Sequence, residues 1–391
     1  MKVQEYYEFS CPVKIVSGLK ALSNLPYEMD QLGARRALIV TDQGVVAAGL
    51  LKVVKGVFEG SGAEIGAIYD QTPTDSGVKA VNQVAKMFTE NKCDCFVAVG
   101  GGSCMDTTKG ANMVVTEGTD DLLKFQGAER LKKPMKPFIA IPTTAGTGSE
   151  VTLAAVIYDE EKKQKMAFTS YYLLPQVAIL DPKMTLTMPP KITAATGMDA
   201  LTHAIEGYYC LQKNPVSDVF CKAGIELIME NLVKCIESPK DEKARLAMAN
   251  GALLAGIGFS NSMVGAVHSL AHSCGANARV PHGVANAILL PWGMEYNLNK
   301  AGDDIAELAP LLGAPTSGSK TDQAKAAIKA VRDLNARLKT LSGLPTTLKD
   351  AGVREDQLEA IAKGAINDGA ATYNPEDLTY EDALAILKKA F

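Results

Sequence analysis

Histidine residues are confined to one stretch of this 391-residue chain. The sequence contains four of them, His203, His268, His272 and His282, and all lie between residues 199 and 282. Histidine is the side chain that binds metal ions most often. A core histidine with satisfied hydrogen bonds is the usual explanation for any one of them, but that explanation accounts poorly for the clustering. The stretch therefore predicts a metal site.

Two pairs of residues in this stretch have helical spacing. Asp199 and His203 are four residues apart, as are His268 and His272, so each pair would project from neighbouring turns of one helix face. Such pairs can chelate one ion, and imidazoles with one carboxylate suit zinc, iron, nickel or copper. Spacing does not decide which of His268 and His272 is the ligand. His282 follows a proline and either begins the next helix or ends the preceding loop.

A second site is predicted at the glycine-rich turn 100–103. A buried strand at 95–99 ends there and an expected helix at 103–115 begins. Such a junction presents free backbone N–H groups and the positive end of a helix dipole, which suit a phosphate. Glycines let a pyrophosphate approach closely and permit a positive φ. Met105 occupies the third glycine position of G-x-G-x-x-G, and a tight structural turn is the alternative interpretation.

Two further segments favour a nucleotide. Asp42 ends a predicted strand, where its carboxylate can bond ribose hydroxyls and repel a 2′-phosphate, although capping a helix is the commoner role. The segment 142–150, rich in threonine and glycine, follows another strand. Its hydroxyl groups can bind phosphate or amide groups, and a solvated loop is the equally favoured alternative.

The elements that must position these residues differ between the two halves of the chain. In the first half, buried strands alternate with amphipathic helices, which predicts a Rossmann-like α/β domain with a parallel sheet and helices on both faces. The expected strands are 37–41, 63–69, 95–99, 138–141 and 176–180, with an edge strand at 13–16, and the expected helices are 45–58, 77–90 and 103–115.

The pattern changes at Met188-Pro189-Pro190, and beyond it the apolar residues recur with helical period. Two prolines would break a helix and suit a domain junction. We therefore expect an α/β dinucleotide-binding domain at 1–188 and an all-helical metal-binding and substrate domain at 189–391. The expected helices of the second domain are 192–209, 217–236, 241–259 and 322–341.

Composition excludes several classes of protein. A net charge of −4 and scattered basic residues argue against nucleic-acid binding. The polar N-terminus does not resemble a signal peptide, and the longest apolar run, 251–259, is too short to span a bilayer. The eight cysteines include no C-x-x-C pair, so reduced, buried thiols are expected. We expect a cytoplasmic protein that binds neither nucleic acid nor membrane.

Four motifs resemble those of the iron-containing (group III) alcohol dehydrogenase family. Residues 100–109, GGGSCMDTTK, resemble the family element GGGSxxDxAK, with Thr108 in place of alanine. Residues 142–151, PTTAGTGSEV, match a second element. Residues 196–206 and 268–290 resemble the two signature regions of the family. The resemblance extends along essentially the whole chain.

This resemblance implies a dehydroquinate-synthase-like fold and an NAD-linked oxidation of a short primary alcohol or diol to the aldehyde. It implies NAD in the first domain and one divalent metal, Fe²⁺ with Zn²⁺ as the alternative, in the second. Homo-oligomers, dimers or larger, are common in the family. The implied metal ligands are Asp199, His203, His268 and His282. His272 is then a candidate proton relay and Phe259 a substrate-wall residue. The implied cofactor-binding residues are Asp42, Gly100, Gly101, Gly102, Ser103, Asp106, Thr143, Thr144, Thr147 and Lys165.

The sequence departs from the family pattern at two places. Pro73-Thr74-Asp75 stands where many members have Pro-Asn-Pro, and Ala154 is apolar where some diol-handling members have a polar residue. Two other functions fit a similar pattern. One is a lyase of the dehydroquinate synthase type that uses NAD transiently, for which the 199–282 stretch is short of basic residues. The other is a metal hydrolase or a metal-binding protein without a nucleotide, which an NAD titration would reveal.

Overall fold

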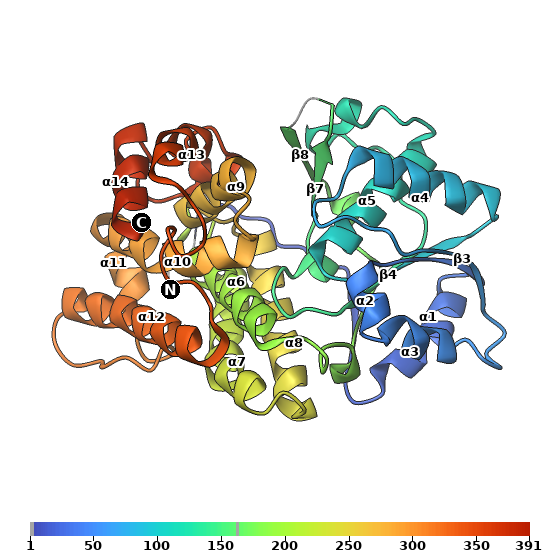
Figure 1. Cartoon of the computed structure of the whole chain (residues 1–391), viewed down its shortest axis with the longest axis horizontal. Coiled ribbons are helices and arrows are strands. Elements are labelled where there is room, and N and C mark those ends of the chain that lie inside the picture. The colour runs from blue at the N-terminus through green and yellow to red at the C-terminus, as the bar shows by residue number, and fades with distance from the viewer. Residues whose placement is uncertain (1–3, 162–163) are drawn as a thin grey trace. The chain divides into compact units, whose positions relative to one another are not determined.

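The computed structural model describes residues 4–161 and 164–391, and it divides into two compact units (Figure 1). One unit is Cys11–Thr187, and the other is Met188–Phe391 together with the N-terminal segment that ends at Ser10. The sequence-based boundary, between 188 and 189, differs by one residue from the boundary in the structure. The N-terminal segment, which we expected within the first domain, belongs to the helical unit because Asn261 bonds both the N–H and the C=O of Ser10.

The α/β unit contains a six-stranded parallel sheet with strand order β1-β9-β6-β4-β2-β3, which confirms the predicted parallel architecture. All the expected strands are present, and β4 supplies the strand before the glycine-rich turn. The strands are β1 (Lys14–Ser17), β2 (Arg36–Val40), β3 (Glu64–Tyr69), β4 (Cys95–Gly100), β6 (Phe138–Pro142) and β9 (Val177–Leu180).

Helices cover both faces of this sheet, because successive side chains of a strand point to opposite faces. On β2, Leu38 and Val40 belong to a core shared with α4 and α5, whereas Ala37 and Ile39 belong to a core shared with α1 and α3. The helices are α1 (Leu25–Gln31), α2 (Gln43–Ala47), α3 (Leu50–Gly56), α4 (Val78–Glu90) and α5 (Gly102–Glu117). The unit also has 3₁₀ turns at Ala21–Asn24, Leu122–Phe125, Ser149–Val151, Tyr171–Leu173 and Pro182–Met184.

Two features of this unit differ from the sequence-based expectation. The single helix expected at 45–58 is two helices, because Gly49 adopts a left-handed conformation with φ 77° between α2 and α3. A small second sheet, β5-β8-β7, was not expected. Its antiparallel pair is β7 (Ala154–Asp159) and β8 (Gln164–Thr169), and β5 is Gly127–Ala128. The short apolar run at 154–158 was the available signal in the sequence.

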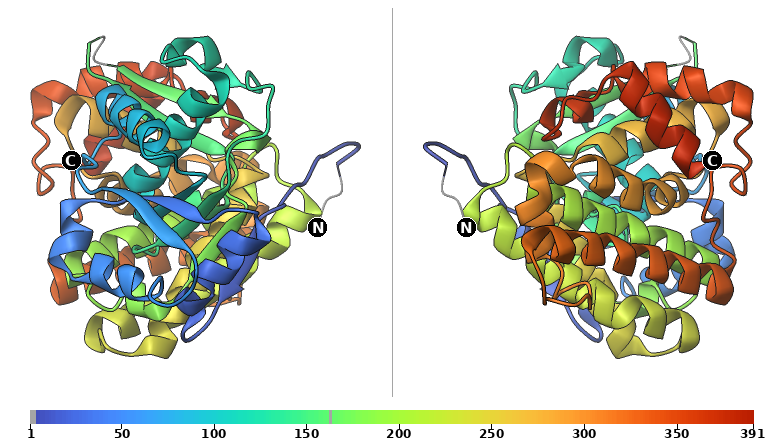
Figure 2. Two further views of the ribbon diagram at one scale, coloured as in Figure 1. Left: turned by 90° about the vertical axis from the view of Figure 1, so that its right-hand side faces the viewer. Right: turned by 90° about the vertical axis from the view of Figure 1, so that its left-hand side faces the viewer.

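The second unit is helical in all its described secondary structure, as the periodicity predicted. Helix α6 packs against α7, α8 and α10, and the long orange-red helix α12 lies on the outside of this unit against α10 and α11 (Figure 2, right). The helices are α6 (Pro190–Tyr209), α7 (Pro215–Glu237), α8 (Glu242–Ser260), α9 (Ala266–Ala278), α10 (His282–Tyr296), α11 (Leu298–Glu307), α12 (Lys320–Ser342), α13 (Leu358–Ala365) and α14 (Tyr380–Ala390), with 3₁₀ turns at Glu355–Gln357 and Gly369–Tyr373. Among the described residues, no helix combines the length and apolar character needed to cross a bilayer.

Candidate functional site

Four of the predicted site residues meet in the helical unit. One nitrogen or oxygen atom from each of Asp199, His203, His268 and His282 lies within 4.8 Å of the corresponding atoms of the others. Asp199 and His203 come from one face of α6, His268 from the first turn of α9 and His282 from the first residue of α10. Three of the four are buried and His282 is partly exposed. Residues as far as 83 positions apart in sequence (199 to 282) are thus brought to one point.

The cluster forms because the three helices approach closely. A Cβ atom on Gly283 would lie 2.4 Å from the carbonyl oxygen of Ala195, so only glycine allows the start of α10 to lie this near α6. The residues of α6 from Gly197 to Tyr209 are all buried, which fixes the rotation of this helix about its axis. This part of α6 is packed on every side, so its polar side chains Asp199, His203 and Glu206 are enclosed by neighbouring elements.

Glu206, one turn after His203 on α6, contacts His268. Its Oε2 lies 2.5 Å from His268 Nδ1, and its two oxygens accept the backbone N–H groups of Val267 and His268. Burial raises the pKa of Glu206 to about 7, against the lowering effect of backbone N–H donors. Burial, with the neighbouring histidines, holds the pKa of His268 well below its usual value, so this imidazole stays neutral. Sequence analysis did not identify Glu206, although its position three after His203 was the signal.

Asn286 is a further buried polar residue against the cluster. Its Nδ2 donates to Asp199 Oδ1 at 2.6 Å and lies 3.2 Å from the Nε2 atoms of both His268 and His282. Its Oδ1 is buried without a hydrogen-bond partner. Asp199 Oδ1, His268 Nε2 and His282 Nε2 therefore all lie around the same amide nitrogen of Asn286. Asn286 follows His282 by four residues, a spacing that sequence analysis could have used.

These observations test whether the cluster suits a metal ion. Three imidazoles and one carboxylate are a donor set for iron or zinc, and their ligand atoms converge. The lowered pKa of His268 keeps its nitrogen available as an electron-pair donor. An orphaned amide oxygen beside the cluster adds a polar atom that the protein alone does not satisfy. The residues fit a divalent metal.

His272 and Phe259 lie at the edge of the cluster. His272 stacks on His282 with ring centroids 5.2 Å apart, and its Nδ1 lies 3.0 Å from Asp368 Oδ2. Burial opposes the ionisation of Asp368, but the nearby His272 lowers its pKa overall. Phe259 stacks on His203 with centroids 4.1 Å apart and rings inclined by 12°. Asp368 gave no signal in the sequence, because it lies 96 residues from His272.

The predicted cofactor residues gather at the carboxyl edge of the parallel sheet. Asp42 follows β2, and the glycine-rich turn follows β4, the neighbouring strand. The connection from β2 leads to β3 on one side, and the chain then returns to β4 on the other, so this is a topological switch point. Nucleotides bind at such a point in open α/β sheets. Asp42 also caps α2 through Val45 N, and its Oδ2 accepts from Cys104 Sγ at 3.3 Å.

Close packing requires glycine at position 100 and favours it at positions 101 and 102. A Cβ on Gly100 would lie 2.4 Å from Cys104 Sγ, and one on Gly101 would lie 3.2 Å from Thr144 Oγ1. The φ angle of Gly101 is −87°, so the positive φ that we allowed for is not used. A Cβ on Gly102 would lie 3.1 Å from Thr147. The turn is therefore lined by threonines and begins α5, which is the predicted phosphate-suited arrangement.

The remaining predicted cofactor residues bond other parts of the unit. Thr143 N–H donates to Gly100 C=O at 3.0 Å, and the Ser103 hydroxyl donates to the carbonyl of Thr74. Lys165, on β8, forms an ion pair with Asp75 at 2.9 Å. The carboxylate of Asp106 accepts hydrogen bonds from Ser149 Oγ and Val156 N.

Lys109, which sequence analysis placed only within a motif, is a buried cation next to this site. Its Nζ donates to the backbone carbonyls of Ser149, Thr152 and Ala154 at 2.8–2.9 Å. Burial lowers the pKa of Lys109 to about 8 and raises that of Glu150 to about 7. Lys109 thereby fastens the end of the threonine-rich segment to α5.

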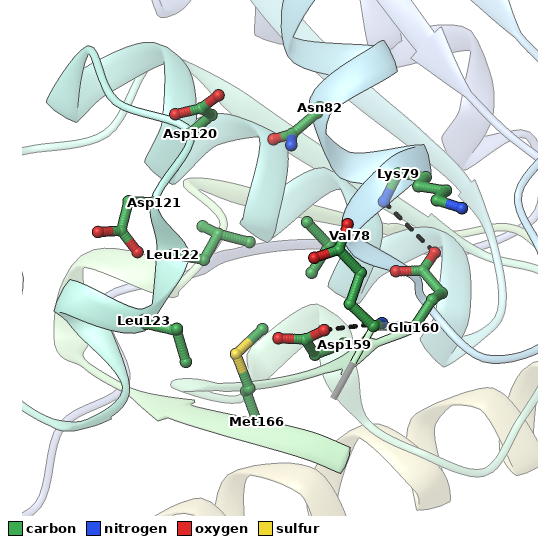
Figure 3. A pocket seen from close by; sticks show the side chains of 11 residues that line it. Val78, Lys79, Asn82, Asp120, Asp121, Leu122, Leu123, Asp159, Glu160 and Met166 are labelled. Atoms are coloured by element: carbon green, nitrogen blue, oxygen red, sulfur yellow. Dashed lines mark hydrogen bonds between the residues drawn. The ribbon is translucent and has the colours of Figure 1, made fainter. Parts of the chain in front are cut away.

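A depression of about 280 Å³ lies elsewhere in the α/β unit, between α4, the turn at Leu122–Phe125 and the end of β7 (Figure 3). None of the predicted cofactor residues lines it. Its polar lining is dominated by carboxylates, Asp120, Asp121, Asp159, Glu160 and Glu161. These would repel a pyrophosphate, so the depression does not suit a dinucleotide.

A switch-point turn suited to a dinucleotide and a cluster suited to a divalent metal are the two sites that a metal-dependent dehydrogenase needs. Comparison with known proteins agrees. The family descriptions "Iron-containing alcohol dehydrogenase" and "Fe-containing alcohol dehydrogenase family, C-terminal" match residues 12–182 and 193–391. The chain belongs to the iron-containing alcohol dehydrogenase family.

Similar proteins include the NAD-dependent methanol dehydrogenase of Bacillus methanolicus, 37% identical over 98% of this chain and 99% of the relative. The 1,3-propanediol dehydrogenase of Klebsiella pneumoniae is 38% identical over 98% and 99% of the two chains. A crystal structure of a 1,3-propanediol oxidoreductase superposes with a TM-score of 0.94 at 37% identity, covering 99% of this chain and 100% of the other. These matches confirm the predicted family and fold.

Proposed function

We propose that this protein catalyses the NAD-linked, reversible oxidation of a short primary alcohol or diol: alcohol + NAD⁺ = aldehyde + NADH + H⁺. The observation that carries the proposal is the convergence of Asp199, His203, His268 and His282 within 4.8 Å. Asp42, which follows β2, would bind the ribose 2′-hydroxyl and so favours NAD over NADP.

Asp199, His203, His268 and His282 would hold one Fe²⁺, with Zn²⁺ as the alternative ion. A divalent ion there supplies Lewis-acid chemistry toward an alcohol or carbonyl oxygen. The protein contributes ligand geometry through Glu206, which bonds His268 Nδ1 on the side away from the cluster, and through Asn286, which donates to Asp199 Oδ1. The carboxylate of Asp199 offsets part of the ion's charge, and the neutral imidazoles leave the remainder.

The α/β unit would bind NAD, whose nicotinamide carries the hydride. Gly100, Gly101 and Gly102 let the pyrophosphate approach the N-terminus of α5. Asp42 would bind the ribose. The other proposed contacts are Ser103, Asp106, Thr143, Thr144, Thr147 and Lys165; of these, Asp106 would act through the segment that it and Lys109 hold.

His272 is the proposed proton relay. Asp368 holds its Nδ1 at 3.0 Å, which orients the ring and supports a positive charge on it. The imidazole can therefore accept the alcohol proton and pass it on. Phe259, stacked on His203, would form an apolar wall that keeps water from the substrate carbon.

The substrate class follows from these residues and from the relatives. The named relatives act on methanol and 1,3-propanediol, which supports a short primary alcohol. Ala154 offers no side-chain hydrogen bond, so we propose that a second hydroxyl on the substrate is tolerated rather than required. We also propose a cytoplasmic homo-oligomer, dimeric or larger, in which the two compact units are the functional domains.

Anaerobic metal analysis combined with an NADH-linked screen of short alcohols, diols and aldehydes tests the proposal. About one Fe²⁺ or Zn²⁺ per chain and turnover of a short alcohol are expected. Metal binding with NAD binding but no net NADH would favour the lyase alternative. Metal binding without NAD binding would favour a hydrolase or a non-catalytic metal protein.

A further inference from the structure

We propose that Glu206 is a positioning residue that fixes the tautomer of His268 so that Nε2 faces the metal-binding cluster. The proposal rests on the proposed metal site and assigns to Glu206 the role of preparing one of its ligands, His268. Glu206 is fully buried, His268 is 2% exposed, and the Oε2–Nδ1 distance of 2.5 Å is that of a strong hydrogen bond.

The orientation of the proton follows from the other contacts of Glu206. Oε1 accepts the N–H of Val267 at 2.8 Å, and Oε2 accepts the N–H of His268 at 3.3 Å. Both oxygens are therefore acceptors toward the first turn of α9. The third neighbour, His268 Nδ1, completes this pattern when it too donates its N–H.

Asn286 supports the same assignment from the opposite side of the ring. Its Nδ2, a donor, lies 3.2 Å from His268 Nε2. One of the two N–H groups of this amide bonds Asp199 Oδ1, and the other can donate to a ring nitrogen, either His268 Nε2 or His282 Nε2. Donation to His268 requires a lone pair on its Nε2, which agrees with the tautomer that Glu206 favours. With Nδ1 protonated and Nε2 bare, His268 already presents the form in which an imidazole binds a metal.

Another role for Glu206 is to cap α9, and the protein offers a matched control for it. Asn374 also caps this helix, since its Oδ1 accepts Ala266 N–H at 3.1 Å. Asn374 also bonds Asn297 and the carbonyl of Glu376, so removing it costs the protein several hydrogen bonds. None of its hydrogen bonds is to a histidine ring. A pure capping role predicts equal effects on metal affinity at the two positions.

The first experiment compares metal affinity in Glu206→Gln and Asn374→Ala, by titrating metal-free protein with Zn²⁺ or Co²⁺ against a chelator. The glutamine amide would donate to Nδ1 and leave the proton on Nε2, so affinity should fall about 10- to 100-fold. Asn374→Ala should stay within about threefold of the unsubstituted protein. Wild-type affinity in Glu206→Gln, or an equal loss in Asn374→Ala, would overturn the proposal.

The second experiment reads the tautomer directly, by ¹⁵N NMR of the histidine ring nitrogens in the metal-free protein. With four histidines, assignment by single substitution is practical. Nε2 of His268 should be unprotonated in the unsubstituted protein and protonated in Glu206→Gln. Protonated Nε2 in the unsubstituted protein contradicts the proposal even if the variant does not fold. Failure of the unsubstituted protein to bind metal would instead refute the metal site itself.

Discussion

The two candidate sites of this protein are built from different materials. The cluster in the helical unit consists of side chains from three helices, of which His268 is bonded by the buried Glu206 and Asp199 by the buried Asn286. The switch-point region of the α/β unit consists of backbone and small residues at the ends of β2, β4 and β6. The metal-suited cluster depends on the ligand atoms that its side chains supply, whereas the glycine-rich turn depends on the space left by the missing side chains.

This difference determines which kind of substitution should abolish binding at each site. Truncating a side chain removes a ligand from the cluster, whereas the glycine-rich turn has almost nothing to truncate and is damaged by added atoms. The supporting charges also differ. The buried cation Lys109 holds the backbone beside the turn through carbonyl groups, while the buried Glu206 bonds the His268 ring and two backbone N–H groups of α9.

The largest effect is expected from His203→Ala. Loss of one ligand should remove bound metal and lower kcat/KM by at least about a thousandfold, because a metal ion contributes several kcal/mol to the transition state. NAD affinity should be unchanged. His272→Ala is the matched control, since it removes a histidine outside the cluster and should retain the metal. Full metal content in His203→Ala would exclude the assigned ligands.

The next effect concerns stability and pH in the α/β unit. The pKa of Glu150 is raised to about 7, so its protonated form adds stability that is complete below the unfolded value near 4.5 and lost as pH rises toward 7. In the unsubstituted protein the free energy of unfolding should therefore fall by on the order of 3 kcal/mol between pH 4.5 and 7, and Glu150→Gln should abolish this fall. Denaturant unfolding of both proteins at several pH values measures it. Parallel profiles for the two proteins would show that Glu150 is already ionised in the fold.

A smaller effect on binding is expected from Gly101→Val. The added side chain would crowd Thr144 and the approach of the pyrophosphate, so the Kd for NAD should rise at least about tenfold, or 1.4 kcal/mol, by calorimetry. Metal content should not change. Gly56→Val is the control, because a Cβ at Gly56 meets nothing within 4 Å. Equal NAD affinity in both variants would place the cofactor elsewhere.

The smallest expected effect is on cofactor choice. Asp42→Asn keeps an N-cap for α2 but removes the negative charge that repels a 2′-phosphate. The ratio of kcat/KM for NAD to that for NADP should fall by about tenfold, which is about 1.4 kcal/mol. Activity with NAD should fall only modestly. An unchanged ratio would mean that Asp42 serves solely as a helix cap.

Much of the fold could be predicted because its signals are local. Buried strands such as 95–99 and helical stripes such as 192–209 are contiguous in sequence, and both elements formed with small shifts at their ends. The break at Gly49 and the pair β7 and β8 were missed. The helix break depends on a single residue, Gly49, that adopts a left-handed conformation inside an otherwise amphipathic pattern. The strands β7 and β8 are short and are stabilised by pairing with each other, which their separate sequences do not indicate.

The sequence by itself predicted a metal-suited cluster, because all four histidines fall in one stretch that also holds two i,i+4 pairs, Asp199 with His203 and His268 with His272, and a helix places such pairs on one face. Spacing left His268 and His272 interchangeable and the family resemblance separated them, but only the tertiary structure shows the physical reason for the difference. Both lie on adjacent turns of α9, and their separation depends on what packs against each ring: Glu206 of α6 behind His268, and Asp368 beside His272. Such partners are distant in sequence, so only the packing of helices can bring them together.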